Sequence, residues 1–585
     1  MNDPSPLTDD VALDPADRRA GYRRQLRFVV AATLAVSTYV FLWTLGTGPV
    51  LGDEACHYRR AVNCFEMPWP DIRATYDTAY PAEGRGSILY WDSCLWHLGL
   101  AVIWKVLGSA SFLAAQLYHT VFLTMLGVFT YLCGRELWGH RGGLWAWALV
   151  LSIPMNLLFG MTFYMEVPVL AFAAVAIYCL LRRRAVLMGL SMAAMFLTKA
   201  PSSAVLIPPL LCASLLVMGD SWRQRLGRTL LAAVVMGLAM VPDMMWRQSH
   251  FGQPVLFRYS TDSGHFYPPE IHRDIITLPF PKQTAVAVGA GNPVNLVKMF
   301  GLPGLLAVAG ALVVTIVGLL RGLFHLWRCL RGKWIPAVWR QLPEAVPRPV
   351  LVLGVPLLCY LIAYLVMLQG AYDVRYLQPI TLPACLLLAG ELSRLSLWPS
   401  KGRSRWIRKA AVMVLVLAMA GQFLAVPPVV ATKYRWLPDS ILQAFQWIRD
   451  ETPPSARFLY VEENLTTLTG RPFFWYAVWP RYLFTSTDEQ QARMLTFVGI
   501  DYIAIHPTRR GPPVDIEVEP TGYPSDWIAS LEGRPYLTRV YPENYDGDST
   551  GRFLIYRVDR HRMPVEWRST TVMGERAPVQ INPSP

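Results

Sequence analysis

The sequence predicts a polytopic α-helical membrane protein with a small α/β domain at its C-terminal end. Hydrophobic residues make up 53% of the 585 residues and charged residues only 16%, which is more apolar surface than one soluble core of this length could bury. Long runs nearly free of charge also recur, and each is near the length of a membrane-crossing helix: 28–47, 144–160, 167–181, 230–245, 302–320, 350–368, 377–389 and 410–430.

The polar N-terminal segment, residues 1–27, is predicted to be a cytoplasmic tail. It is acidic at first and becomes basic between Arg18 and Arg27, just before the first apolar run. No small-residue cleavage site closes a short apolar core, so the segment does not fit a cleaved signal peptide. We therefore expect the first run to remain as a span.

The formal net charge of +13 does not indicate a nucleic-acid partner, because the basic residues are spread over short loops between apolar runs. Short basic loops stay in the cytoplasm. Placing all these clusters on that side predicts about eleven spans within residues 28–431; the clusters are 135–141, 182–184, 223–228, 321–340 and 401–409. The nine cysteines, most of them inside apolar runs, predict no disulfide framework.

The apolar stretch 88–107 is the exception to this alternation, because a crossing there would reverse the side of every later basic loop. Trp91, Asp92, His97 and Trp104 also suit an interfacial helix. We predict an amphipathic or re-entrant juxtamembrane helix inside an outer loop of residues 48–110. The alternative is an ordinary span, with a weak span miscounted elsewhere. A second outer loop is predicted at residues 247–297.

The hydrophobic pattern changes after residue 431. Residues 439–451 are amphipathic at helical spacing, whereas 457–461, 502–505 and 553–558 have the composition of short strands. We predict a small α/β domain at 432–560 outside the membrane, followed by a flexible, proline-rich tail at 561–585.

Asp53 and Glu54 follow the first span directly on the predicted outer side, with His57 and Tyr58 next to them. Charged residues at span ends invite a functional explanation, and two adjacent carboxylates can supply a general base or ligate a divalent cation. They can equally begin a helix, with Asp53 as its cap and Glu54 in its first turn.

Glu166 and Lys199 are two further candidates at predicted breaks between apolar runs. Glu166 could join the Asp53–Glu54 pair in an outer pocket that holds a metal or positions a nucleophile, or it could cap a helix. Lys199 precedes Pro201, and an ammonium at a broken helix suits a phosphate. Snorkelling of the lysine to lipid headgroups is the alternative.

Arg375 and Tyr376 open a late span on the outer side. An arginine beside tyrosines can hold a phosphate through two parallel hydrogen bonds, although an aromatic-belt anchor has the same composition. The second outer loop, which carries His265, could close over a substrate or simply connect two spans.

In their order along the chain, these motifs resemble the GT-C class of membrane glycosyltransferases, above all family 39 with its protein O-mannosyltransferases and lipid A aminoarabinose transferases. The motifs are Asp53-Glu54, a juxtamembrane segment, Glu166, Leu197-Thr198-Lys199-Ala200-Pro201 and Arg375-Tyr376-Leu377-Gln378-Pro379. The sequence departs from the family at Glu166 (often Asp), at Ala200 (often Gly), and at Tyr90-Trp91-Asp92, where the family often has His-Pro-Pro-Leu.

The resemblance implies an inverting transfer of a sugar from a polyprenyl-phosphate donor to a lipid, glycan or protein acceptor. Asp53 would be the base, Glu54 and Glu166 would orient the acceptor or bind a cation, and Lys199, Arg375 and Tyr376 would bind the donor phosphate. His57, Tyr58, Tyr90 and His265 would position substrate. The resemblance implies no definite cofactor, and a divalent cation at Asp53, Glu54 and Glu166 stays open. The expected location is a bacterial inner membrane with a periplasmic site, and the alternatives are a transporter or flippase, or another envelope transferase.

Overall fold

The computed structural model describes most of the bundle and of the C-terminal domain. The described residues are 15–45, 52–66, 95–251, 293–330, 346–367, 374–397, 403–434, 439–460, 464–471, 473–475, 487–505, 530–542 and 553–568. Among the predicted site residues, Tyr90 and His265 lie outside these ranges, as do the side chains of Asp53, Arg375 and Tyr376.

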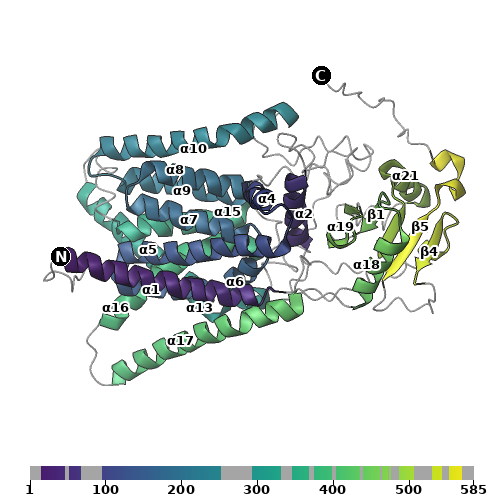
Figure 1. Ribbon diagram of the computed structural model, residues 1–585. Helices are drawn as coiled ribbons and strands as arrows, with labels where there is room; N and C mark the ends of the chain where they lie inside the picture. The colour runs from purple at the N-terminus through teal and green to yellow at the C-terminus, as the bar shows by residue number, and fades with distance from the viewer. Residues whose placement is uncertain are drawn as a thin grey trace.

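The N-terminal three quarters of the chain form a bundle of helices that run side by side (Figure 1). Its long elements are α1 (Pro15–Leu42), α5 (Phe112–Ser152), α6 (Pro154–Met161), α7 (Glu166–Leu181), α8 (Ala185–Thr198), α9 (Ala200–Val217), α10 (Trp222–Phe251), α13 (Pro293–Leu330), η3 (Val350–Gly354) continuing into α15 (Val355–Met367), η4 (Val374–Ile380), α16 (Thr381–Leu397), and α17 (Arg403–Val429) ending in η5 (Val430–Tyr434).

Several of these helices are apolar enough to cross a membrane. In the described part of the chain, five helices pass a test of length and composition, and α6 with α7 makes a sixth candidate bent by 114°. α7 lies in the core and is buried on nearly every side, whereas α10 and α17 expose leucine, valine and methionine along their length. An apolar exposed surface of this kind faces lipid. The chain is an integral membrane protein, and the number of eleven spans remains a prediction.

α5 is a helical hairpin rather than one rod of 41 residues. Gly139 has φ 76° and ψ −175°, which interrupts the helix. A Cβ on Gly134 would meet Ala146, and one on Gly143 would meet the Tyr131 carbonyl. Twelve residues of straight helix would instead separate these groups by about 18 Å. The chain therefore reverses at Gly139, inside the basic cluster 135–141 at which the sequence predicts a turn.

Two helices lie across one end of the bundle instead of along it. α2 (Gly52–Glu66) crosses the ends of the bundle helices, and α4 (Leu95–Leu107) is seen end-on beside it (Figure 1). α4 covers most of the stretch for which a juxtamembrane helix is predicted. Its Trp96, His97 and Trp104 are buried, whereas Val106 and Leu107 are exposed. The N-terminus of α1 lies at the opposite end of the bundle.

The basic clusters gather at that opposite end. Arg135 stacks on Tyr22 of α1, Arg182 pairs with Glu136, and Arg348 donates to the Leu181 carbonyl. These contacts connect four segments that are far apart in the sequence, around residues 22, 135, 182 and 348. They therefore place the predicted cytoplasmic turns on a common side, away from α2 and α4.

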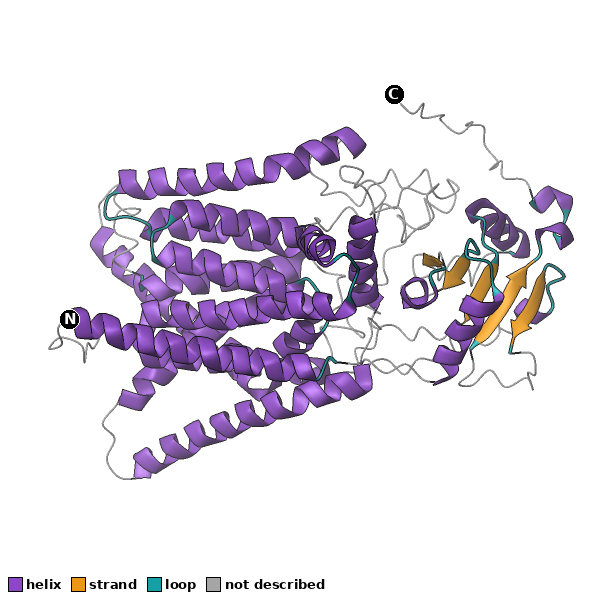
Figure 2. Ribbon diagram, viewed as in Figure 1, coloured by secondary structure: helices purple, strands orange, loops and turns teal. Residues whose placement is uncertain are grey.

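The C-terminal domain is a five-stranded sheet flanked by short helices (Figure 2). The strand order is β2-β1-β3-β5-β4, with β1 parallel to β2 and β3, and with β5 antiparallel to β3 and β4. The elements are α18 (Asp439–Glu451), β1 (Phe458–Tyr460), α19 (Asn464–Thr469), β2 (Phe473–Trp475), α21 (Asp488–Val498), β3 (Tyr502–Ile505), β4 (Leu537–Tyr541), β5 (Leu554–Val558), η7 (Arg560–Arg562) and η8 (Val565–Trp567). The predicted helix and three predicted strands match α18, β1, β3 and β5.

Candidate active site

A buried ion pair between Glu166 and Lys199 forms the centre of the candidate site. Lys199 Nζ donates to Glu166 Oε1; Lys199 is only 9% exposed and Glu166 only 4%. The second carboxylate oxygen of Glu166, Oε2, has no protein partner within the described part of the chain. An acceptor without a partner is costly when buried, so Glu166 offers a ready site for a hydroxyl or a water.

Local backbone structure brings the two residues of this pair together. α8 ends at Thr198, and Lys199 has an extended backbone with φ −152° and ψ 99° before the proline at the start of α9. The proline is Pro201, the second residue of α9. It has no N–H to donate to a carbonyl of the preceding turn, and its ring clashes with that turn, which favours a helix break at this point. The Ser203 hydroxyl donates to the Lys199 carbonyl across the break. Glu166 begins α7, where the helix dipole favours a negative charge.

A tyrosine on α15 extends the polar cluster around this pair. Tyr360 is buried, hydrogen-bonds with Ser202 of α9, and lies within electrostatic range of both Glu166 and Lys199. Tyr360 was not among the predicted site residues. In the sequence it is only one hydroxyl inside the apolar run 350–368, and an interfacial tyrosine would look the same.

α2 brings the first acidic motif to the same end of the bundle. Glu54 is fully buried and His57 nearly so, and residues three and four apart share a helix face. Tyr58 stacks on Phe163 with ring centroids 6.1 Å apart, three residues before Glu166. Since Asp53 also belongs to α2, the backbone carrying both acidic residues packs over the turn that leads into Glu166.

A pair of histidines joins α2 to α4. His57 Nδ1 and His97 Nε2 are 3.0 Å apart, and both rings are buried. One ring must donate and the other accept in such a contact, so the two cannot both be fully protonated. His97 fixes the predicted substrate-positioning residue His57 against the juxtamembrane helix.

The 3₁₀ helix η4 carries the Arg375–Tyr376 motif to this end. Gln378 Nε2 donates to Asn156 Oδ1 at 2.9 Å, and Asn156 Nδ2 donates to the Val150 carbonyl. η4 also packs against α7. The two amides therefore tie the backbone that precedes Gln378 to α6. Gln378 belongs to the predicted motif 375–379 but had no predicted role, and Asn156, an amide inside the apolar run 144–160, was not predicted.

The structure thus gathers the acidic helix α2, the Glu166–Lys199 pair and η4 at one end of the bundle. The positions of Tyr90 and His265, and the side-chain positions of Asp53, Arg375 and Tyr376, lie outside what is described. Within the described residues, no group of three or more His, Cys, Asp or Glu side chains is arranged to hold a metal ion. A site that includes the Asp53 carboxylate is not tested by this observation.

No family model and no curated protein matches the chain, but several solved structures do. The crystal structure of ArnT from Cupriavidus metallidurans bound to undecaprenyl phosphate is 14% identical, with a TM-score of 0.53 over 90% of this chain and 97% of that one. The structure of the archaeal oligosaccharyltransferase AglB from Archaeoglobus fulgidus, in complex with an inhibitory peptide and a dolichol-phosphate, is 12% identical, with a TM-score of 0.51 over 92% and 77%.

The oligosaccharyltransferase from Archaeoglobus fulgidus in complex with Zn and sulfate gives a TM-score of 0.54 at 13% identity, over 92% of this chain and 74% of that one. These matches span the bundle and most of the remaining chain. The chain therefore has a GT-C-like fold, which confirms the predicted resemblance at the level of the fold.

Proposed function

We propose that the protein is an inverting glycosyltransferase that moves a sugar from a polyprenyl-phosphate donor to a lipid, glycan or protein acceptor on the outer face of the membrane. The observation that carries the proposal is the buried Glu166–Lys199 pair beneath the acidic helix α2. The GT-C-like fold supports it, because one structure with this fold holds undecaprenyl phosphate and another holds a dolichol-phosphate.

The proposed reaction is one displacement at the anomeric carbon. An acceptor oxygen or nitrogen forms the new bond to that carbon, its proton passes to Asp53, and the bond to the phosphate oxygen breaks with both electrons leaving on the phosphate. Glu54 and Glu166 orient the acceptor through hydrogen bonds. Lys199, Arg375 and Tyr376 offset the charge of the departing polyprenyl phosphate, which is the main electrostatic demand of the step.

The remaining assignments follow from this scheme. His57, Tyr58, Tyr90 and His265 are proposed to position substrate, residues 28–431 to form the catalytic domain, and residues 432–560 to form a periplasmic domain. The proposed location is a bacterial inner membrane. A divalent cation at the carboxylates is not needed for any step as written.

The test is a transfer assay with purified protein, radiolabelled polyprenyl-phosphate sugars and candidate acceptors. Asp53→Asn should lower turnover by about 100-fold or more, the usual range for loss of a general base. Glu136→Gln, which alters a carboxylate at the opposite end of the bundle, is the matched control and should leave turnover unchanged. Equal turnover by Asp53→Asn removes Asp53 as the base. Movement of intact sugar lipid across vesicles without a new glycosidic bond supports a transporter instead.

A further inference from the structure

The C-terminal domain contacts the helix that carries the first acidic motif. α19 packs against α2, and Figure 1 shows α19 as the part of the domain nearest to that helix. α2 itself is a short helix of 15 residues that crosses the end of the bundle. A short helix in this position depends on its neighbours for a fixed orientation. The position of α19 therefore bears on the position of Asp53 and Glu54.

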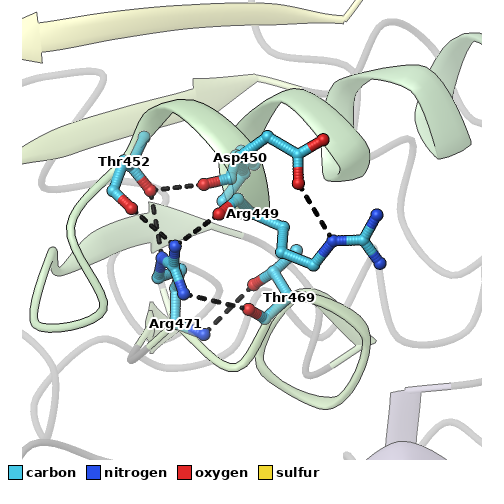
Figure 3. A network of polar contacts seen from close by, with 6 residues as sticks. Arg449, Asp450, Thr452, Thr469 and Arg471 are labelled. Atoms are coloured by element: carbon cyan, nitrogen blue, oxygen red, sulfur yellow. Dashed lines mark hydrogen bonds and ion pairs between the residues drawn. The ribbon is translucent and has the colours of Figure 1, made fainter.

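A buried arginine, Arg471, links α19 to α18 within the domain (Figure 3), in addition to the apolar contacts of Leu465 and Leu468 with the core of the domain. It lies two residues after the end of α19 and is only 8% exposed. Its Nη2 donates to the carbonyls of Arg449 and Thr452, at 2.6 and 2.5 Å. Its Nε donates to Thr452 Oγ1 at 3.1 Å, and its Nη1 donates to the Thr469 carbonyl at 3.3 Å.

These bonds join the C-terminal ends of two helices. Arg449 belongs to the last turn of α18, and Thr452 follows that helix directly, where carbonyls lack partners within the helix. Thr469 is the last residue of α19. A guanidinium is suited to this task because its donors lie in one rigid plane and its charge complements the negative ends of both helix dipoles.

We infer that Arg471 is a positioning residue for the reaction, and that one role of the C-terminal domain is to hold α2 in place through α19. The inference rests in part on the proposed function, because it concerns the helix that carries the proposed base. The physical chain runs from α18 through the Arg471 guanidinium to α19, and from α19 to α2. Removing the bonds between the Arg471 guanidinium and α18 should let α19, and with it α2, shift, although no group that touches substrate is lost.

The first experiment is amide hydrogen exchange on the full chain in detergent or nanodiscs, comparing wild type with Arg471→Met. The methionine keeps a long side chain but removes every donor. We expect the amides of residues 52–66 to exchange about tenfold faster or more, as expected when a local unit loses a stabilising contact. Arg471→Lys, which keeps one cation without the planar fork, should give an intermediate increase.

Arg534→Met is the matched control in the same domain. Arg534 is likewise buried, at 6% exposure, and it bonds to Gln491, Ser530 and Asp488. Two of these partners belong to α21, which lies farther from α2 than α19 does in Figure 1. This variant should speed exchange within the domain and leave α2 protected. Equal loosening of α2 by both variants overturns the inference, because it indicates general destabilisation of the domain.

The second readout is steady-state transfer. Arg471→Met should lower kcat about tenfold while the KM for the donor stays within about twofold, because a misplaced base affects the chemical step. Should Arg471→Met fail to fold, Thr452→Val removes one acceptor of the network and should shift both readouts in the same direction. Unchanged exchange of α2 in a folded Arg471→Met protein rejects the inference. If α2 exchanges faster in Arg471→Met but the wild-type protein itself transfers no sugar, the proposed function is rejected and the inference about α2 stands.

Discussion

At the scale of single residues, the Glu166–Lys199 pair is unusual because both charges are removed from water. Burying an ion costs several kcal/mol, and the attraction between two buried ions offsets that cost only with good geometry and further hydrogen bonds. Glu166 Oε2 has no such bond within the described residues. A pair left incomplete in this way contributes little to stability, and its presence is better explained by a ligand that completes it.

Substitutions at this pair separate stability from function. Lys199→Met leaves the Glu166 carboxylate buried without its cation, so it should destabilise the protein by about 3 to 5 kcal/mol. The double variant Glu166→Gln/Lys199→Met should recover most of that loss, because no charge stays buried, but it should recover no transfer activity. Thermal unfolding in detergent and the transfer assay measure the two effects.

The exposed pair Arg182–Glu136 is the control for this prediction. Its side chains are 47% and 30% exposed, and surface pairs contribute about 1 kcal/mol or less. Arg182→Gln should therefore change the unfolding midpoint little. A double variant at the buried pair that remains as unstable as Lys199→Met would contradict the electrostatic explanation.

Gln378 makes a further prediction at this scale. Gln378→Leu leaves Asn156 Oδ1 without the Gln378 donor in a buried position, at a cost of about 1 to 3 kcal/mol. Because η4 also carries Arg375, the KM for the donor should rise more than kcat falls. Gln224→Leu, at an exposed position in α10, should change neither constant. A fall in kcat alone would place the role of Gln378 elsewhere.

At the scale of elements, the sequence predicted which segments form helices better than it predicted how they turn. The basic cluster 135–141 indicated a turn, but the reversal occurs at Gly139 alone, without a loop. The open choice at Asp53 and Glu54 included a helix start, and α2 does begin at Gly52. β2 and β4 were missed: β2 has only three residues, and β4 lacks a strand-like alternation because Thr538 and Arg539 are adjacent.

Which distant side chains contact one another could not be predicted from the sequence. The order of runs placed Glu166 and Lys199 on a common side, because α7 and α8 form consecutive antiparallel helices. Nothing in the pattern specified that they bond to each other, that Tyr360 lies beside them, or that Gln378 bonds to Asn156. Those contacts depend on the rotation of each helix about its axis, which is set by packing on all its faces.

Two glycines, Gly139 and Gly301, lie at breaks in helices, and substituting them tests how much strain each break carries. Gly139 and Gly301 both have positive φ with ψ near 180°, a region essentially restricted to glycine, so Gly139→Ala should cost about 1 to 3 kcal/mol. Gly301→Ala should cost more, because its Cβ would overlap the side-chain amide of Gln422. Thermal unfolding measures both effects.

Gly237→Ala in α10 is the control for these two variants. Gly237 lies in a helix of ordinary geometry, with no atom near the place of a Cβ. Alanine there should be neutral or stabilising by up to about 1 kcal/mol. A similar loss of stability at all three glycines would show that the strain of the two breaks is not the cause.

At the scale of the whole molecule, the two ends of the bundle are chemically different. One end carries the arginine clusters with Glu136 and Asp220 as partners. The other carries α2, α4, the buried Glu166–Lys199 pair and, beyond them, the C-terminal domain (Figure 1). Arginine-rich turns are retained in the cytoplasm, so this difference predicts which end faces which compartment.

Cysteine labelling in sealed vesicles of known orientation tests that prediction. In a cysteine-free background, Ser109→Cys next to α4 and Val565→Cys in the C-terminal domain, both exposed positions, should react together with a membrane-impermeant maleimide added outside. Asp220→Cys in an arginine-rich turn should react only after permeabilisation. The reason is the odd number of crossings that separates Asp220 from the other two sites under the eleven-span prediction. If Ser109→Cys, like Asp220→Cys, reacts only after permeabilisation, the segment 88–107 crosses the bilayer. The candidate site would then lie in the cytoplasm, or the predicted alternation of spans would be wrong.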